Sequence, residues 1–373
     1  MRSLAILADD LTGALDAAAP FATSSEPVRV SWRDAPLSGE PRIAFDTESR
    51  DLAGDQAATR VASALTRFGD AGLRFKKLDS LIRGNTLLET ATCTASPAFR
   101  SVVIAPAFPE ENRITRHGTQ IAPDRNGRAT PVADLAAGLR QHGVPLALVQ
   151  RGGTLPRRGI SLCDAETSDD LAAIAHQGAH LDGPVLWCGS AGLARALGPS
   201  ASDGRAIRLS AGPRLFIVGS PHPVALSQAA RLRTLLGAAL VAVTGDLRPT
   251  DTVTPAVRAI AVGQSGAITF DIPTLDAVRV EAIMSATFSA LARSPPPPVV
   301  VVVGGDTLFR LCRATAATSL LANGEWAPGV PIARIDGGAW DGTSIVTKSG
   351  AFADRDMLVR LLEGPPKEEC TWT

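Results

Sequence analysis

The chain has 373 residues, more than one compact core usually needs, so we expect two domains. The 37 basic residues equal the 37 acidic ones, so nothing in the overall charge attracts nucleic acid or an anionic membrane. The five cysteines form no CxxC pair and suggest neither a disulfide framework nor a zinc site, which favours reduced thiols and a cytoplasmic location. Acidic residues interrupt the first apolar run at once, so we expect no signal peptide and no membrane span.

Short β-branched runs alternate with Ala- and Leu-rich stretches such as ALDAAAPFA, DLAAGLRQ and GLARALG. The predicted strands are 3–8, 42–45, 73–78, 101–105, 145–149, 184–188, 214–218, 239–243, 267–270, 299–303 and 343–347. This alternation predicts an α/β fold, with two α/β domains, largely parallel sheets and a ligand cleft between the domains. The run 299–303 is VVVVV without polar alternation, as expected for a strand covered on both faces.

The segment 198–213 is rich in Gly, Ser, Ala and Pro and separates two similar α/β series. Such a composition indicates a domain boundary, so we place the domains at residues 1–205 and 212–373. A second polar stretch, 125–131, is predicted to be a loop inside the first domain, and 294–298 a stiff approach to the next strand.

The first candidate site is the segment Ala8 to Ala14, which follows a strand and precedes a helix. Ligands of open α/β sheets bind beyond the carboxyl ends of strands, where a carboxylate can accept a proton from a substrate hydroxyl. Neighbouring residues of an extended segment point in opposite directions, so we expect one of Asp9 and Asp10 to face a ligand and the other to cap the helix or bind the backbone. Alternatively, both acids only complement the helix N-terminus, which is the commoner situation for this spacing.

The second candidate site is KKLDSLIRGN, residues 76–85, where a strand again enters a polar turn. Lys77 and Asp79 share one face of the strand by its period of two, and the guanidinium of Arg83 suits a carboxylate. A strand-end salt bridge without a ligand is the alternative. The third candidate, PAFPEENR (106–113), offers Arg113 as an anion contact or is a proline-fixed surface loop. The turn Gly189–Gly192 lets a backbone approach either a ligand or the sheet.

Three small-residue turns follow strands of the second half: Gly219–His222, Gly304–Thr307 and Lys348–Phe352. Backbone N–H groups and helix N-termini in such turns bind phosphate, and Lys348 can neutralise phosphate charge. Each turn alone is also compatible with ordinary glycine geometry, but three in one domain favour a nucleotide. The P-loop, GxGxxG, HExxH and GxSxG patterns are missing, and His176 and His180 suggest a solvated helix end rather than a metal site.

Six motifs in this order resemble the four-carbon acid sugar kinase family: ADDLTGALD, KLDSLIRGN, PAFPEENR, GSAGLARAL, GGDT and KSGAF. The resemblance covers nearly the whole chain. It implies an acid-sugar-binding domain over 1–205, a nucleotide-binding domain over 212–373, and phosphorylation of acids such as threonate, erythronate or their oxo derivatives with ATP. Mg²⁺ is expected with ATP, but no ligands can be assigned to it.

The site residues combine these motifs with the resemblance. Catalytic roles are predicted for Asp10, Asp9 and Arg83; substrate binding for Lys77, Asp79, Ser80, Arg83 and Arg113; nucleotide binding for Ser220, Gly304, Gly305, Asp306, Thr307, Lys348 and Gly350. The sequence departs from the family pattern at Leu81-Ile82, where the family has threonine and leucine, at Asn112, where it has glycine, and at Gln120, where a histidine is expected.

The mechanism predicted is in-line transfer of the ATP γ-phosphoryl group to an alcohol of a short hydroxy acid, with closure of the cleft on both substrates. Arg83 and Lys77 hold the carboxylate, and Asp10, or failing that Asp9, orients or deprotonates the hydroxyl. One alternative is a metal-dependent phosphohydrolase, whose Asp-x-Asp signature the adjacent acids do not match. Another is a non-catalytic sensor of a sugar acid or nucleotide. The sequence leaves the oligomeric state open, a homo-oligomer included.

Overall fold

The computed structural model describes residues 3–32, 40–124, 127–199, 209, 212–244, 249–271 and 276–364. The chain divides into two compact units, Met1–Arg205 with Leu321–Gly324, and Ala206–Leu320 with Glu325–Thr373. Most of the predicted boundary segment 198–213, residues 125 and 126 of the predicted loop, and Cys370 lie outside the described residues.

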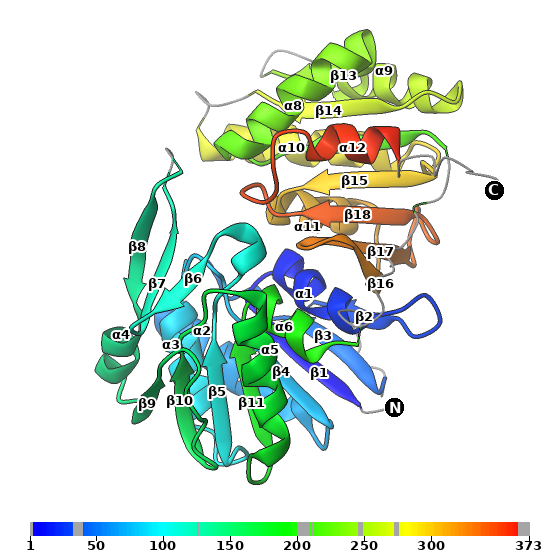
Figure 1. Cartoon of the computed structure of the whole chain (residues 1–373). Helices are drawn as coiled ribbons and strands as arrows, with labels where there is room; N and C mark the ends of the chain where they lie inside the picture. The colour runs from blue at the N-terminus through cyan, green and yellow to red at the C-terminus, as the bar shows by residue number, and fades with distance from the viewer. Residues whose placement is uncertain are drawn as a thin grey trace, which may run out of the picture. The chain divides into compact units, whose positions relative to one another are not determined.

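The first unit is built on a sheet whose strands are all paired in parallel (Figure 1). The strand order is β2-β3-β1-β4-β11-β5-β10-β9. The strands are β1 Leu4–Ala8, β2 Val28–Ser31, β3 Arg42–Asp46, β4 Leu73–Lys77, β5 Ser101–Ala105, β9 Leu146–Val149, β10 Gly159–Cys163 and β11 Val185–Gly189. Parallel pairing brings the carboxyl ends of β1, β3 and β4 to one edge of this sheet.

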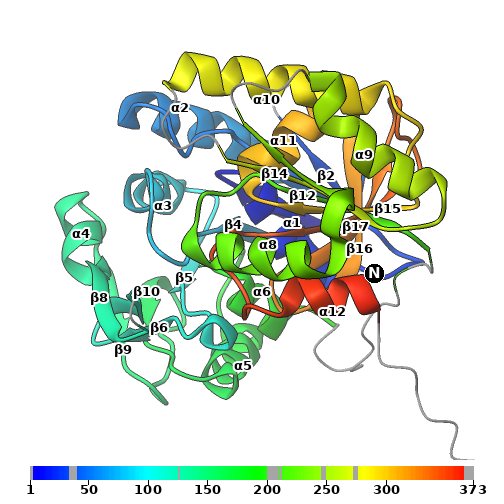
Figure 2. The same cartoon turned by 90° about the horizontal axis from the view of Figure 1, so that it is seen from above.

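Helices cover both faces of this sheet (Figure 2). They are α1 Leu11–Ala18, α2 Gly54–Leu65, α3 Thr86–Thr94, α4 Leu135–Gln141, α5 Ser168–Gln177 and α6 Ala191–Leu197. Apolar side chains of α2, α3 and α4 pack into one core with β1, β3, β5 and β11, while α1 packs with α5 and α6 on the other face. A capping box of Thr167 and Asp170 begins α5.

A separate three-stranded antiparallel sheet interrupts the first unit between β5 and α4. Its strands are β6 Ile114–Arg116, β7 Thr119–Pro123 and β8 Ala129–Asp134, in the order β6-β7-β8. The predicted loop 125–131 is therefore wrong at its end, because β8 begins at Ala129. These strands were not predicted because β7 contains Pro123 and β8 contains Pro131, and a proline in a sequence argues against a strand.

The second unit contains a mixed sheet in the order β13-β14-β12-β15-β18-β17-β16. The strands are β12 Arg214–Val218, β13 Leu240–Val243, β14 Gly266–Phe270, β15 Val299–Val303, β16 Ser319–Ala327, β17 Val330–Asp336 and β18 Ser344–Lys348. The pairs from β13 to β18 are parallel, whereas β17 runs antiparallel to β18. Every residue of β15 is buried, as its unbroken valine run predicted.

The helices of the second unit also lie on both faces of its sheet (Figure 2). They are α8 Pro223–Leu236, α9 Pro249–Ala261, α10 Ala277–Ala292, α11 Gly305–Ala314 and α12 Met357–Glu363. α8 and α12 pack into one core with β12, β15 and β18, and α9, α10 and α11 pack together on the other face. The predicted α/β class is confirmed, and each of the eleven predicted strands is present with bounds within one residue.

Short 3-10 helices follow or join these elements: η1 Ala19–Phe21, η2 Thr66–Phe68, η3 Pro109–Glu111, η4 Gly178–His180 and η5 Gly237–Ala239. Among the helices that the structure describes, none combines the length and apolar character needed to cross a membrane.

Candidate functional site

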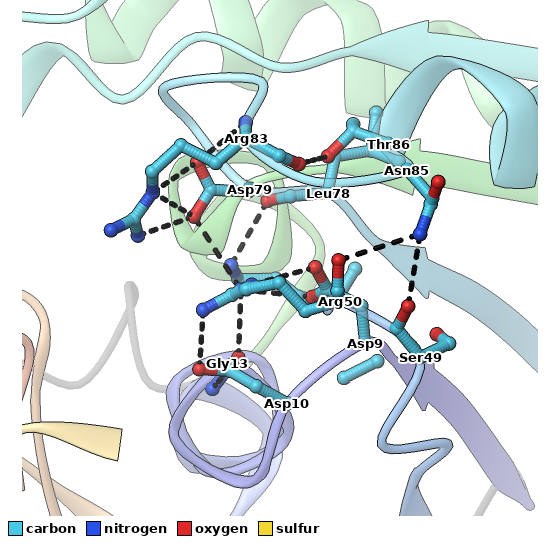
Figure 3. Close-up of polar contacts among 12 residues, drawn as sticks. Asp9, Asp10, Gly13, Ser49, Arg50, Leu78, Asp79, Arg83, Asn85 and Thr86 are labelled. Carbon is cyan, nitrogen blue, oxygen red and sulfur yellow. Dashed lines mark hydrogen bonds and ion pairs between the residues drawn. The ribbon is translucent and has the colours of Figure 1, made fainter. Parts of the chain in front are cut away.

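Arg50 lies at the centre of the polar groups that follow β1, β3 and β4 (Figure 3). Its Nε and Nη2 donate to Asp9 at 2.9 and 3.0 Å, and its Nη1 and Nη2 donate to Asp10 at 2.6 and 2.9 Å. Nη2 also lies 3.4 Å from Asp79 Oδ2. One guanidinium thus joins carboxylates from two strand ends, a geometry that suits its planar donors.

Because neighbouring strand residues point in opposite directions, we expected Asp9 and Asp10 to have different partners. The structure instead gives them a common partner. Both contact Arg50, because a guanidinium is wide enough to bridge carboxylates that leave the backbone on opposite sides. Asp10 also caps α1, since its Oδ1 accepts a hydrogen bond of 2.9 Å from Gly13 N. The capping alternative therefore holds for Asp10 alone, and Gly13 is required because a Cβ there would lie 2.5 Å from Asp10 Oδ1.

The pKa values of the two aspartates move in opposite directions. Burial alone would raise the pKa of Asp9, but the charges of Arg50 and Lys76 and the hydrogen bonds from Arg50 hold it below its usual value. Burial raises the pKa of Asp10, against the attraction of Arg50 and with the help of the Asp9 charge. The Asp9 side chain is 3% exposed and that of Asp10 22%, so Asp10 is the more accessible of the two.

A buried network holds the turn that carries Arg50. Lys76 Nζ donates to Glu89 Oε2 at 2.7 Å, and Glu89 Oε1 accepts from Ser49 Oγ at 2.6 Å. Both charged side chains are 1% exposed. Burial alone would lower the pKa of Lys76, but the Glu89 carboxylate beside it raises that pKa instead. The ion pair therefore fixes Ser49, and the backbone of Ser49 and Arg50 in turn donates to Asp9 O.

The polar turn after β4 closes on its own aspartate. Asp79 accepts from the backbone N–H of Leu81 and Arg83 and from the Arg83 guanidinium, with the shortest contact 2.6 Å from Nη2. Burial alone would raise the pKa of Asp79, but the hydrogen bonds and charge of Arg83 hold it well below its usual range. The turn therefore contains a strand-end salt bridge, and Arg83, whose side chain is 51% exposed, still offers N–H groups to solvent.

Ile82 in this turn has a φ of 57°, in the left-handed region that a β-branched residue rarely adopts. Asn112 also has a positive φ, 56°, which explains why a glycine suits that position and why asparagine replaces it at little cost. The two family departures therefore differ physically. Ile82 stores backbone strain of about 1–3 kcal/mol next to Arg83, whereas Asn112 does not.

Ser80, Arg113 and Gln120 form one buried group. Arg113 Nη1 donates to Ser80 Oγ, and Gln120 Nε2 donates to Ser80 O at 2.9 Å. Gln120 Oε1 accepts from Thr115 Oγ1 at 2.8 Å, so its amide is used at both ends. Burial lowers the pKa of Arg113. The structure brings together Ser80 and Arg113, which the sequence had placed in separate motifs, and gives Gln120 a role in holding Ser80.

The turn at Gly189 to Gly192 approaches the protein's own backbone. A Cβ at Gly189 would lie 2.6 Å from Ala105 O, and one at Gly192 would lie 2.7 Å from Ala107 O. Ser190 caps α6 and donates to Ala107 O. The expected close approach to the sheet is present at these glycines.

The three glycine turns of the second unit meet at the carboxyl ends of β12, β15 and β18, which are neighbours in the sheet. A Cβ at Gly350 would lie 1.9 Å from Ser220 Oγ, and a Cβ at Gly304 would lie 3.3 Å from Ser220 Cβ. Gly304 has a φ of 112° and is the N-cap residue of α11, whose first turn contains Thr307. A Cβ at Gly219 would lie 2.2 Å from Thr307 Oγ1. The turns therefore form one close-packed group that no larger residue fits.

The remaining predicted nucleotide residues lie around this group. Lys348 is fully buried at the end of β18, and its Nζ donates to Ser349 O at 2.8 Å. Gly305 is the first residue of α11. Asp306 points its carboxylate to Arg310 at 2.8 Å, one turn along the same helix. Lys348 is thus held against the KSGAF turn, whereas Asp306 serves a surface ion pair.

Arg50 and Glu89 are the central residues that sequence reasoning missed. Arg50 belongs to the polar turn DTESR directly after β3, so the same rule that selected the other strand ends would have found it. Glu89 has no comparable signal, because it lies inside α3 and only the fold brings it to Lys76. For a metal, the described part of the chain contains no group of three His, Cys, Asp or Glu residues that could hold one.

Two family models match the chain. A sugar-binding N-terminal domain matches residues 4–154, and a nucleotide-binding C-terminal domain matches residues 215–358. A D-threonate kinase of Cupriavidus necator is 33% identical over 95% of this chain and 95% of its own length. A D-erythronate kinase of Heliobacterium modesticaldum is 26% identical over 95% of each chain. A solved structure from Salmonella typhimurium shares the fold, with a TM-score of 0.69 at 18% identity over 96% of this chain and 98% of its own.

Proposed function

Because this chain belongs to the four-carbon acid sugar kinase family and is a sugar-acid kinase, we propose that it transfers the γ-phosphoryl group of ATP to a hydroxyl of an acid such as threonate or erythronate. We assign acid binding to residues 1–205 and nucleotide binding to residues 212–373, which contain the two family matches. The same proposal assigns the protein to the cytoplasm, where ATP is supplied.

The observation that carries the acceptor site is the cluster of charged groups at the carboxyl ends of β1, β3 and β4 (Figure 3). We propose that Arg83 binds the carboxylate of the acid with its exposed N–H groups and that Lys77 adds a point charge. Asp79 holds Arg83 in place through the contact of 2.6 Å. Ser80 and Arg113, joined to each other, complete the polar lining of this site.

We propose that Asp10 orients or deprotonates the acceptor hydroxyl, with Asp9 as the alternative. Two features support Asp10: its greater exposure and its raised pKa, which makes it the stronger base of the pair. Arg50 opposes that role, since it stabilises the ionised carboxylate. Replacement of Asp10 by Asn tests the assignment, because a near-normal kcat would exclude Asp10 as the base.

For the donor, we propose that the close-packed turns around Ser220, Gly304 and Gly350 bind the phosphates of ATP, together with Gly305, Asp306 and Thr307. Support comes from the N-terminus of α11, where backbone N–H groups and the helix dipole favour an anion. Lys348 adds positive charge to the same turns. Mg²⁺ would arrive with the nucleotide, whose phosphates bind it together with several water molecules.

The test is ADP release by the purified protein with a panel of four-carbon acids, each compared with the ATPase activity measured without an acid. We expect turnover with at least one stereoisomer of threonate or erythronate. No turnover above the acid-free rate with every member would refute the proposed reaction. Phosphate release from sugar phosphates without ATP would instead support a phosphohydrolase, and tight acid binding without ADP would support a sensor.

A further inference from the structure

Helix α1 carries a second polar face, one turn beyond the aspartates that bind Arg50. Thr12 and Asp16 are four residues apart and therefore lie on the same side of the helix. They are 7% and 4% exposed. Among the described residues, neither Thr12 Oγ1 nor Asp16 Oδ1 has a hydrogen-bond partner. Two buried unpaired oxygens on one helix face are unusual, because such groups lose their hydration without compensation.

Lys77 lies beside this face. Its Nζ is 3.9 Å from Asp16 Oδ2, too far for a hydrogen bond, and would lie 3.6 Å from a Cβ at Gly13. Among the described residues, its Nζ donates one hydrogen bond, to Leu78 O at 2.9 Å. An ammonium group has three N–H donors, so two remain for a ligand. Lys77 thus forms an ion pair with Asp16 through Oδ2 but makes no hydrogen bond to it, and Oδ1 of the same carboxylate has no hydrogen-bond partner among the described residues.

Four charged groups from different parts of the first unit act on Asp16. Lys77 of β4, Arg113 after η3 and Arg195 of α6 attract its negative charge, and Asp10 of α1 repels it. Burial outweighs the attraction and raises the pKa of Asp16 to about 6. Above that pH the carboxylate is ionised and accepts hydrogen bonds only, so its missing partner must be a donor.

We propose that Thr12, Asp16 and Lys77 form a subsite that binds a hydroxyl of the substrate, namely the hydroxyl next to its carboxylate. This inference rests on the proposed function, in which Lys77 contacts that carboxylate. Threonate and erythronate both carry this hydroxyl, so the new element is that Asp16 has a specificity-determining role for it. It is distinct from the role of Asp10, which faces Arg50.

The chemistry of the three groups selects an alcohol over other ligands. A carboxylate or phosphate placed between Lys77 and Asp16 would pair with Lys77 but would be repelled by ionised Asp16. A hydroxyl accepts a hydrogen bond from Lys77 and donates one to Asp16, and Nζ and Oδ2 are close enough for one oxygen to reach both. Thr12 Oγ can bond a neighbouring oxygen of the same ligand.

Sites that bind a hydroxyl with buried polar groups discriminate strongly against an analogue that lacks it, because those groups are then left unpaired. We therefore expect the wild-type protein to bind the preferred stereoisomer of threonate or erythronate about 100-fold more tightly than 3,4-dihydroxybutanoate, which lacks the 2-hydroxyl. The isomer 2,4-dihydroxybutanoate keeps that hydroxyl and should lose far less affinity.

The decisive experiment measures the binding of these three acids to the wild-type protein and to its variants by calorimetry at pH 8. Asp16→Ala should weaken binding of the parent acid and of 2,4-dihydroxybutanoate by about 30-fold or more, and binding of 3,4-dihydroxybutanoate by less than about threefold. Thr12→Val, which keeps the shape of the side chain, should give a smaller loss in the same direction. Asp70→Asn, an exposed acid, is the matched control and should change none of the three.

An equal loss for all acids in Asp16→Ala would show a structural role and overturn the subsite. So would equal wild-type affinity for the parent acid and 3,4-dihydroxybutanoate, which is the result expected if a water molecule satisfies these groups. Because calorimetry needs no ATP, it judges the subsite even where no ADP forms, an outcome that refutes only the proposed reaction. Absence of binding by every acid to the wild-type protein would overturn both.

Discussion

The buried charge on Asp16 should lower the free energy of unfolding, and Asp16→Asn should raise it again. The pKa of Asp16 rises from 3.8 to about 6 on folding because the carboxylate is buried. Between these two pH values the folded chain binds more protons at this position than the unfolded chain. The free energy of unfolding must therefore fall as pH rises from about 4 to about 6, and the loss is complete above that range.

The magnitude follows from the size of the shift. At about 1.36 kcal/mol per pKa unit, the ionised Asp16 destabilises the protein by about 3 kcal/mol at pH 8, by less than about 1 kcal/mol at pH 4 and by almost nothing below about pH 3. An asparagine has nearly the same shape and no charge, so Asp16→Asn should gain up to that amount at pH 8. For a unit of this size, each kcal/mol corresponds to about 2–4 °C in Tm.

Urea unfolding of the wild-type protein, Asp16→Asn and the control Asp70→Asn at several pH values measures this effect. We expect the advantage of Asp16→Asn to grow between pH 4 and pH 7, while the control stays close to wild type. If Asp16→Asn is no more stable than wild type at pH 8, or if its advantage is the same at pH 4, Asp16 is not buried as a charged group. A gain in stability with weaker acid binding would be the signature of a residue kept for its ligand.

Three further results are expected. Glu89→Gln leaves Lys76 charged and buried without its partner, so urea unfolding should show a free energy of unfolding lower by about 3–5 kcal/mol. A decrease below about 1 kcal/mol would mean that this ion pair does not stabilise the fold. Gly350→Ala puts a Cβ against Ser220, so titration with ATP should show a KM for ATP raised about tenfold or more. An unchanged KM for ATP would remove these turns from the nucleotide site. In Arg50→Lys, the lysine cannot replace the guanidinium that binds Asp9 and Asp10 together. The value of kcat/KM for the acid should fall about tenfold or more, while KM for ATP stays within about twofold. Equal effects on both substrates would argue for misfolding instead.

Periodicity and glycine turns were enough to predict the α/β fold and the eleven strands. Some of the strands that were not predicted contain residues that normally end a strand. Pro331 lies in β17 and Asn323-Gly324 in β16, and both patterns indicate turns in a sequence read alone. β2 is only four residues long, and β10 follows a run rich in arginine and glycine. In these cases pairing with neighbouring strands overrides the local signal.

The candidate sites were predictable where a motif follows a strand, because parallel pairing collects strand ends at one edge of a sheet. Lys77, Asp79 and Arg83 were found in this way. Arg50 obeys the same rule but was overlooked. Asp16 ends the motif ADDLTGALD but was given no role, because nothing in its helical neighbourhood distinguishes a buried aspartate from a solvated one. Its significance depends on packing, which leaves its Oδ1 without a partner among the described residues.

The central claim is that ATP phosphorylates a hydroxyl of a four-carbon acid in this protein. Phosphorus NMR of a reaction with ATP and the best acid of the panel tests it most directly. The account predicts a new phosphomonoester resonance that grows in equal amount with ADP and is missing when the acid is left out. Growth of inorganic phosphate instead, with no phosphorylated acid, would contradict it.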